Sequence, residues 1–198
     1  EQRIQLVKAV AGIVKGRCPV IANIGTFSTK STVKMAEAVA DCGISAISAV
    51  PPFYFSYSKE EILQYYRDLA GATGMPVLIY NIPKMSGVSF GTDELLGFLQ
   101  NDGILGVKQT TMDLMQTETL VRKCGDRVIF NGHDEIWLPA LSVGVRASIG
   151  STFSIMGDVC VGIKKAFDEG NMERARFLQG RCNEMIKVLL DIGIFPAI

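Results

Sequence analysis

Histidine, tryptophan and net charge are scarce in this sequence of 198 residues. It contains one His and one Trp, and its 20 basic side chains balance 20 acidic ones. A zero net charge without a block of one sign gives no reason to expect binding to nucleic acid or to an anionic membrane surface. The apolar runs are only as long as strands, which argues against a transmembrane helix. The charged opening stretch EQRIQLVKAVAGIVKG does not resemble a secretory signal.

The cysteines form no motif. Their number is odd and no CxxC spacing occurs; they are Cys18, Cys42, Cys124, Cys160 and Cys182. Scattered cysteines of this kind argue against a disulfide framework and against a zinc site. We therefore expect buried, reduced thiols in a cytoplasmic protein.

Strand-like and helix-like segments alternate along the chain. The apolar, strand-like segments lie near 19–25, 46–53, 76–83, 104–110, 127–132 and 146–152. Strands that are apolar on both faces and are separated by helices are typical of a parallel sheet covered by helices. No linker rich in proline, serine or glycine interrupts the pattern, so we expect one α/β domain over residues 1–198.

The sequence also lacks the nucleotide-binding loops GxGxxG and GxxxxGK[ST] that often accompany a doubly wound sheet. Polar residues instead follow several different strands: Tyr80, Lys108, Thr110, Asp134, Glu135 and Ser151. This distribution favours a TIM (β/α)8 barrel, whose active site is built from many strand ends. A complete barrel takes about 250 residues. We therefore expect a truncated piece with about six β/α units, without the first two strands and the C-terminal helices.

Lys108 stands near the end of the apolar strand segment GILGVKQTT. Desolvation disfavours a charged ammonium, and a neutral amine is a nucleophile that forms a Schiff base with a carbonyl. Tyr80 ends the preceding strand in LIYNIP and could relay a proton over the same substrate. The alternative interpretation is structural: a lysine that reaches water and a tyrosine that packs on the core.

The segment YNIPKMSG, followed 28 residues after its tyrosine by the lysine of GVKQTT, resembles the pyruvate-dependent class I aldolases of the dihydrodipicolinate synthase and N-acetylneuraminate lyase family. The resemblance covers essentially the whole chain. It implies that Lys108 forms an imine with pyruvate and that Tyr80 transfers protons, without a metal or an organic cofactor. It also implies a substrate-binding set: Thr110, Gly132, Asp134, Glu135, Gly150 and Ser151. The family's carboxylate-binding loop, similar to GSTGE, is expected to precede the first residue.

Four segments favour the lyase branch of the family over the synthase branch. The synthase branch resembles YNVPxRT at the segment YNIPKMSG, and Met85 stands in the place of its arginine. A methionine cannot replace an arginine that binds a carboxylate. The segments GVKQTT, NGHDEI and SIGSTFSIMG are similar to lyase segments. The resemblance thus implies reversible cleavage of N-acetylneuraminate, a sialic acid, to N-acetylmannosamine and pyruvate. It implies small-molecule partners, neither nucleic acid nor membrane, and a homotetramer.

Other interpretations stay open at this point. The chain could be another pyruvate-imine aldolase or synthase, acting on a 2-keto-3-deoxy sugar acid or in the manner of dihydrodipicolinate synthase. It could also be a non-catalytic member that binds sialic acid or pyruvate. Asp134 and Glu135 would suit a helix N-terminus, and Ser151 and Thr152 could cap the next helix. We expect His133 to be a loop residue without a catalytic role.

The methionines of the segment TTMDLMQTETL have no role in these functions. Methionine is apolar and adaptable, so we expect this segment to pack them into the core.

Overall fold

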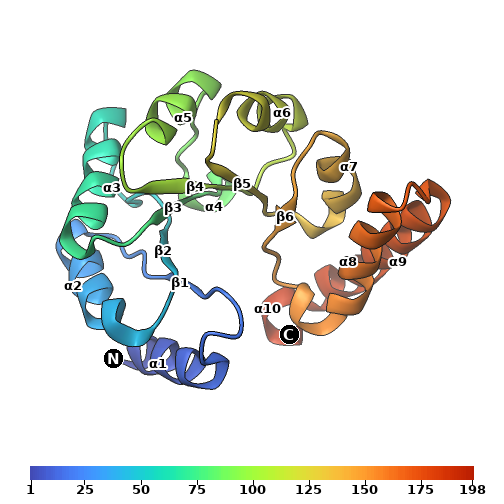
Figure 1. The fold of residues 1–198 in the computed structure, drawn as a ribbon, viewed down its shortest axis with the longest axis horizontal. Coiled ribbons are helices and arrows are strands. Elements are labelled where there is room, and N and C mark those ends of the chain that lie inside the picture. The colour runs from blue at the N-terminus through green and yellow to red at the C-terminus, as the bar shows by residue number, and fades with distance from the viewer. The chain divides into compact units, whose positions relative to one another are not determined.

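The computed structural model describes residues 1–198, with the exception of the side chain of Phe195. Strands and helices alternate along the chain, as Figure 1 shows. The strands are β1 (Ile21–Asn23), β2 (Ala46–Ala49), β3 (Val77–Asn81), β4 (Ile104–Gln109), β5 (Val128–Asn131) and β6 (Ala147–Ser148). The α-helices are α1 (Gln2–Val14), α2 (Thr29–Val39), α3 (Lys59–Thr73), α4 (Pro83–Ser86), α5 (Thr92–Leu99), α6 (Leu114–Lys123), α7 (Trp137–Ser142), α8 (Phe153–Asp168), α9 (Met172–Ile192) and α10 (Ile194–Ala197). Two 3-10 turns, η1 (Ala40–Cys42) and η2 (Asp134–Ile136), complete the chain.

The chain divides into two compact units. Unit 1 comprises residues 1–107 and 124–128, and unit 2 comprises residues 108–123 and 129–198. In unit 1, β1, β2, β3 and the first four residues of β4 follow one another in the sheet. Their parallel register places Ile21 beside Ala46 and Ile47 beside Val77. In unit 2, the end of β4, most of β5 and β6 follow in the same order, with β5 and β6 parallel.

Helix α3 shows how local sequence sets the helices of unit 1. Ser58 accepts a hydrogen bond from the Glu61 amide at 3.2 Å, and the Glu61 carboxylate accepts one from the Ser58 amide at 2.7 Å. This is the capping box that the spacing of the two residues predicts. The helix buries an apolar face that includes Tyr66, whose hydroxyl donates to the Ala49 carbonyl of β2 at 3.2 Å. Capping and burial therefore place α3 against the sheet.

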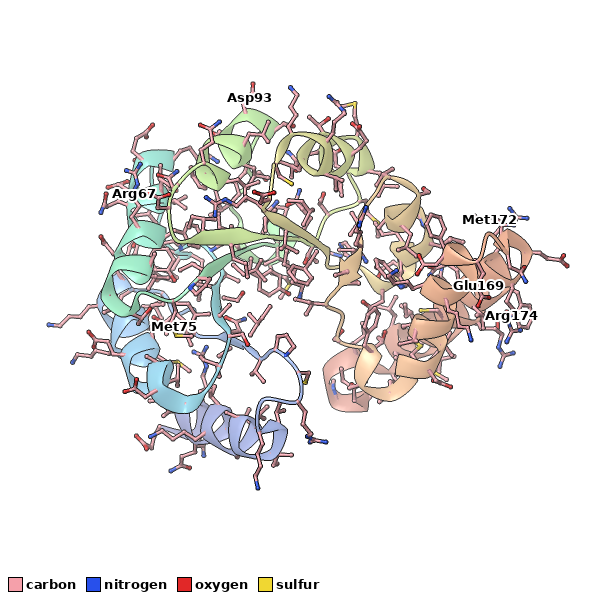
Figure 2. All side chains as sticks on the ribbon, viewed as in Figure 1. Arg67, Met75, Asp93, Glu169, Met172 and Arg174 are labelled. Atoms are coloured by element: carbon pink, nitrogen blue, oxygen red, sulfur yellow. The ribbon has the colours of Figure 1, made fainter. Side chains whose placement is uncertain are left out.

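In unit 2, helices α8 and α9 pack side by side (Figure 1). Their shared apolar face includes Cys160, Ile163, Cys182 and Ile186, all buried. Arg67 of α3 in unit 1 and Arg174 of α9 in unit 2 are exposed (Figure 2), and the Arg67 guanidinium donates to the Asn101 side-chain oxygen at 2.7 and 2.9 Å. None of the helices in the described part of the chain combines the length and the apolar character that spanning a membrane requires.

Two expectations at the level of elements are wrong. The last strand covers only Ala147–Ser148: Ile149 still donates to the Asn131 carbonyl of β5 at 2.9 Å, but the chain then turns into α8. The methionines of TTMDLMQTETL were expected in the core, but Met112 is 56% exposed and Met115 is 79% exposed. Met112 lies before α6, and Met115 lies in its first turn; the helix instead buries Thr117 and Leu120, so its apolar stripe leaves Met115 outside.

Candidate active site

Lys108 is the fifth residue of β4, and its side chain is half-buried. Its neighbours in the strand, Val107 and Gln109, are buried. Thr110 follows directly after the strand, is 8% exposed, and has a hydroxyl oxygen without a hydrogen-bond partner among the described residues. Gly132 lies against it, and a Cβ atom at Gly132 would overlap the Thr110 hydroxyl. Gly132 and Thr110, both predicted for the site, thus pack so closely that the position of Thr110 requires a glycine at 132.

Asp134 opens the 3-10 turn that follows β5, and it is only 4% exposed. Its Oδ2 atom accepts two hydrogen bonds from Thr152, one from the hydroxyl at 2.6 Å and one from the backbone amide at 3.0 Å. Its Oδ1 atom has no hydrogen-bond partner among the described residues. A Cβ atom at Gly150 would overlap Oδ1. Asp134, Gly150 and Thr152 therefore form one tightly packed cluster in unit 2.

Burial raises the pKa of the Asp134 carboxyl, and the nearby charge of Glu135 acts in the same direction. The hydrogen bonds from Thr152 and the positive charge of Lys108 oppose this rise in pKa. Desolvation is the largest cause, because a carboxylate removed from water loses most of its hydration. The site therefore couples the charge state of Asp134 to Thr152 and Lys108.

The raised pKa of Asp134 has a consequence for stability. As pH rises through the usual aspartate range, the unfolded chain releases this proton first, while folded Asp134 keeps it until its raised pKa is passed. Over that window the group makes the free energy of unfolding fall with increasing pH. We expect Asp134→Asn in the full-length protein to lessen this fall, measured by urea unfolding between about pH 3 and pH 7. Equal pH slopes for wild type and variant would contradict the prediction.

Glu135 and His133 lie on either side of Asp134. His133 Nδ1 is 3.1 Å from Glu135 Oε1, and both side chains are partly exposed. His133 is thus a loop residue that contacts a predicted substrate-binding residue, a pairing that its position in the sequence did not indicate. Ser151 is exposed, and its carbonyl accepts a hydrogen bond from Ser154 at 3.0 Å.

Helix α9 holds the turn that carries Asp134. Gln179 donates to the Asp134 carbonyl at 3.1 Å and accepts from the Leu138 amide at 2.8 Å. Its side chain is buried, so these bonds are protected from water. Sequence reasoning missed this residue, because a glutamine 45 positions away carries no local signal of such a contact.

These contacts bear on the structural interpretations of Asp134 and Thr152. The Asp134 carboxylate binds Thr152 rather than the amides of its own turn. Thr152 does occupy the N-cap position of α8, but its side chain makes no capping hydrogen bond. Its hydroxyl serves Asp134 instead. Asp134 and Glu135 do lie in the first turn of η2, as the helix-terminal interpretation predicts, whereas a capping role of the Thr152 side chain is not seen.

Gly150→Ala provides a direct test of this packing. The added methyl group must displace Asp134 or the chain around it, and overpacking of this kind costs about 1–3 kcal/mol of unfolding free energy. Urea unfolding of the full-length protein measures the change. Gly180→Ala is the matched control: Gly180 lies within α9 with nothing near its Cβ position, so we expect a gain of about 0.5–1 kcal/mol. A neutral Gly150→Ala would contradict the described geometry.

Tyr80 is the fourth residue of β3, half-buried, and belongs to unit 1. Lys108 and the substrate-binding set all belong to unit 2. The structure thus brings Thr110 and Gly132 together, and Asp134, Gly150 and Thr152 together, with Lys108 close enough to influence Asp134. The approach of Tyr80 to Lys108 stays a prediction.

Unit 2 also holds a cleft of about 620 Å³, lined by residues that include Arg146, Phe153 and Lys164. None of the predicted site residues is among those that line it. We place the candidate site at Asp134 and Thr110, because buried polar atoms without partners indicate a ligand more directly than an open cleft does. Among the described residues, no group of three or more His, Cys, Asp or Glu side chains could hold a metal ion.

The model of the dihydrodipicolinate synthetase family matches residues 1–198 of the chain. The chain belongs to this family. The family predicted from YNIPKMSG and GVKQTT is therefore confirmed. So is the predicted fold class, the α/β fold of a TIM barrel represented by about six β/α units.

Several relatives that the chain matches carry the name N-acetylneuraminate lyase. The chain is 40% identical to the Citrobacter koseri N-acetylneuraminate lyase over 195 residues, which is 98% of the chain and 66% of that relative. A Clostridium difficile protein crystallised with mannosamine is 32% identical, with a TM-score of 0.94 over 97% of the chain and 66% of the other. A Ruminococcus gnavus sialic acid aldolase, solved as a catalytic lysine mutant, is 29% identical, with a TM-score of 0.86 over 90% of the chain and 59% of the other.

The chain spans 65% and 66% of the length of the Rhizobium meliloti and Citrobacter koseri lyases that it matches.

Proposed function

We propose that this chain carries the catalytic lysine and the sugar-binding residues of a class I aldolase that cleaves N-acetylneuraminate reversibly to N-acetylmannosamine and pyruvate. The observation that carries the proposal is the cluster in unit 2. There Lys108 lies in the same unit as Thr110 Oγ1 and Asp134 Oδ1, buried oxygen atoms without hydrogen-bond partners in the described part of the chain. Identity of 40% to a named N-acetylneuraminate lyase supports this substrate.

In the proposed reaction, the Lys108 amine attacks the C2 ketone of open-chain N-acetylneuraminate. Loss of water gives an imine at C2, which accepts the electron pair of the C3–C4 bond as an enamine forms between C2 and C3. The Tyr80 hydroxyl relays a proton in this step. It accepts the proton of the C4 hydroxyl as the C3–C4 bond breaks and passes its own proton on toward C3 of the enamine, and N-acetylmannosamine leaves as an aldehyde. The remaining enamine is protonated at C3, and water releases pyruvate and the free amine. No oxidant or reductant enters this sequence.

The substrate-binding set would select a polyhydroxylated chain. Carboxylates accept several hydroxyl hydrogen bonds, and Asp134 and Glu135 are adjacent acids in unit 2. Asp134 Oδ1 and Thr110 Oγ1 are buried acceptors that a bound hydroxyl would satisfy. Met85 is exposed, and it stands where the pattern of the synthase branch has an arginine that binds a carboxylate. A methionine at this position supports the lyase branch.

The test is a comparison of substrates with the full-length protein. Pyruvate release is measured from N-acetylneuraminate and, in parallel, from a 2-keto-3-deoxy sugar acid. Faster release from N-acetylneuraminate supports the proposal. Faster release from the other acid would favour a different pyruvate-imine aldolase, and binding of sialic acid without any release would favour a non-catalytic member.

The proposal extends to organisation and assembly. We infer that residues 1–198 form part of one TIM-barrel domain and that the protein works as a homotetramer in the cytoplasm, as the family resemblance implies. Light scattering of the full-length protein would test the assembly, since a monomeric mass would contradict it.

A further inference from the structure

A buried carboxylate needs hydrogen-bond donors, and Asp134 receives its two from a single residue. The Thr152 hydroxyl lies 2.6 Å and the Thr152 amide 3.0 Å from Oδ2. Hydrogen bonds to a charged acceptor are stronger than neutral ones. Thr152 is itself only 2% exposed and is β-branched, so its side chain has little freedom to turn away.

The two oxygen atoms of Asp134 are thereby made unequal. Oδ2 is saturated by Thr152, whereas Oδ1 has no partner among the described residues. The backbone of Gly150 closes off one side, because even a Cβ atom there would overlap Oδ1. The carboxylate is thus held in one orientation, with Oδ1 as the oxygen that can accept from a bound hydroxyl.

Both hydrogen-bond donors of Thr152, its hydroxyl and its amide, are directed to Asp134, and its side chain makes no capping bond to α8. We propose that Thr152 is a positioning residue that fixes the Asp134 carboxylate for binding the hydroxylated part of the substrate. The inference rests on the proposed function and adds a specificity-determining residue to the sugar-binding set. It predicts an effect on the sugar and none on pyruvate, whose imine forms at Lys108.

The test compares Thr152→Val with Thr152→Ser in the full-length protein. Valine has the shape of threonine without the hydroxyl, and serine keeps the hydroxyl. We expect Thr152→Val to raise the KM for N-acetylneuraminate about 10-fold or more, the effect of one lost hydrogen bond to a charged group. Thr152→Ser should stay within about 2-fold of wild type. Borohydride trapping of pyruvate on Lys108 should be unchanged in both variants.

A second readout does not depend on turnover. The titration of the Asp134 carboxyl, followed by carbon NMR of labelled aspartate, should move to higher pH in Thr152→Val and not in Thr152→Ser. The charged or titratable groups around Asp134 are Glu135 of its own turn, Lys108 of β4, Cys160 of α8 and Cys182 of α9. All four are the same in both variants, so a difference between the variants reports on the hydroxyl.

Three results would overturn the inference: no change in KM with Thr152→Val, an equal loss of pyruvate trapping, or serine behaving like valine. The proposed function would instead be contradicted if the wild-type protein neither cleaved N-acetylneuraminate nor was trapped with pyruvate. In that case the carboxyl titration alone decides whether Thr152 holds Asp134.

Discussion

Lys108→Arg is expected to abolish covalent trapping with pyruvate. Borohydride reduction of the lysine–pyruvate imine adds the elements of pyruvate less one oxygen, about 72 Da, to the wild-type protein. Arginine keeps the positive charge but is effectively always protonated, so it cannot act as the amine nucleophile. The cleavage rate should fall on the order of 10³-fold or more, because the covalent intermediate is lost. Mass spectrometry of a digest places the adduct.

Lys123→Arg is the matched control for this experiment. Lys123 lies in the same unit, at the end of α6, and is exposed. We expect the Lys123→Arg variant to be trapped with pyruvate on Lys108 and to cleave the substrate at the wild-type rate. An adduct on any lysine other than Lys108, or an undiminished adduct in Lys108→Arg, would show that the nucleophile has been misassigned.

Tyr80→Phe is expected to slow cleavage by about 10²- to 10⁴-fold, the range in which a positioned acid or base contributes. Phenylalanine keeps the packing of the half-buried ring on β3 and removes only the hydroxyl. Pyruvate should still be trapped on Lys108 after long incubation, because the amine remains. Stopped assays of pyruvate release measure the rate, and trapping under the same conditions shows that the variant is folded.

The exposed Tyr57 provides the control, since Tyr57→Phe removes a hydroxyl from the same unit without touching the proposed reaction. We expect wild-type rates from it. A Tyr80→Phe enzyme that cleaves N-acetylneuraminate within about 3-fold of wild type would rule out the tyrosine as the proton carrier.

The sequence was enough to predict the strands, because their signals are local. The apolar runs around Ile79 and Val107 are bounded by proline, glycine and polar residues, and the structure has β3 and β4 there. The capping box at Ser58 was equally readable. Helix α4 was not predicted, because Pro83 was taken only as the end of a strand, whereas proline also suits the first turn of a helix.

The candidate site was less readable, because its contacts join distant parts of the chain. The hydroxyl of Thr152 reaches 18 positions back to Asp134, and Gln179 reaches 45 positions back to the same residue. Neither pairing has a spacing that a helix or strand would impose. The family resemblance implies that Asp134 and Gly150 bind substrate, which stays a prediction. Only the coordinates reveal that Gly150 lies against Asp134 and that Thr152 binds the Asp134 carboxylate.

Gly132 and Gly150 limit how this site could be redesigned. Each glycine makes room for the side chain of a different residue, Thr110 and Asp134 respectively. A mutant library that varies either glycine alone would consist largely of destabilised proteins, since every other amino acid brings a Cβ atom that overlaps its neighbour. Variation at Gly150 becomes tolerable only when Asp134 shrinks in the same clone. New sugar preferences are therefore most accessible through paired changes at Gly150 and Asp134.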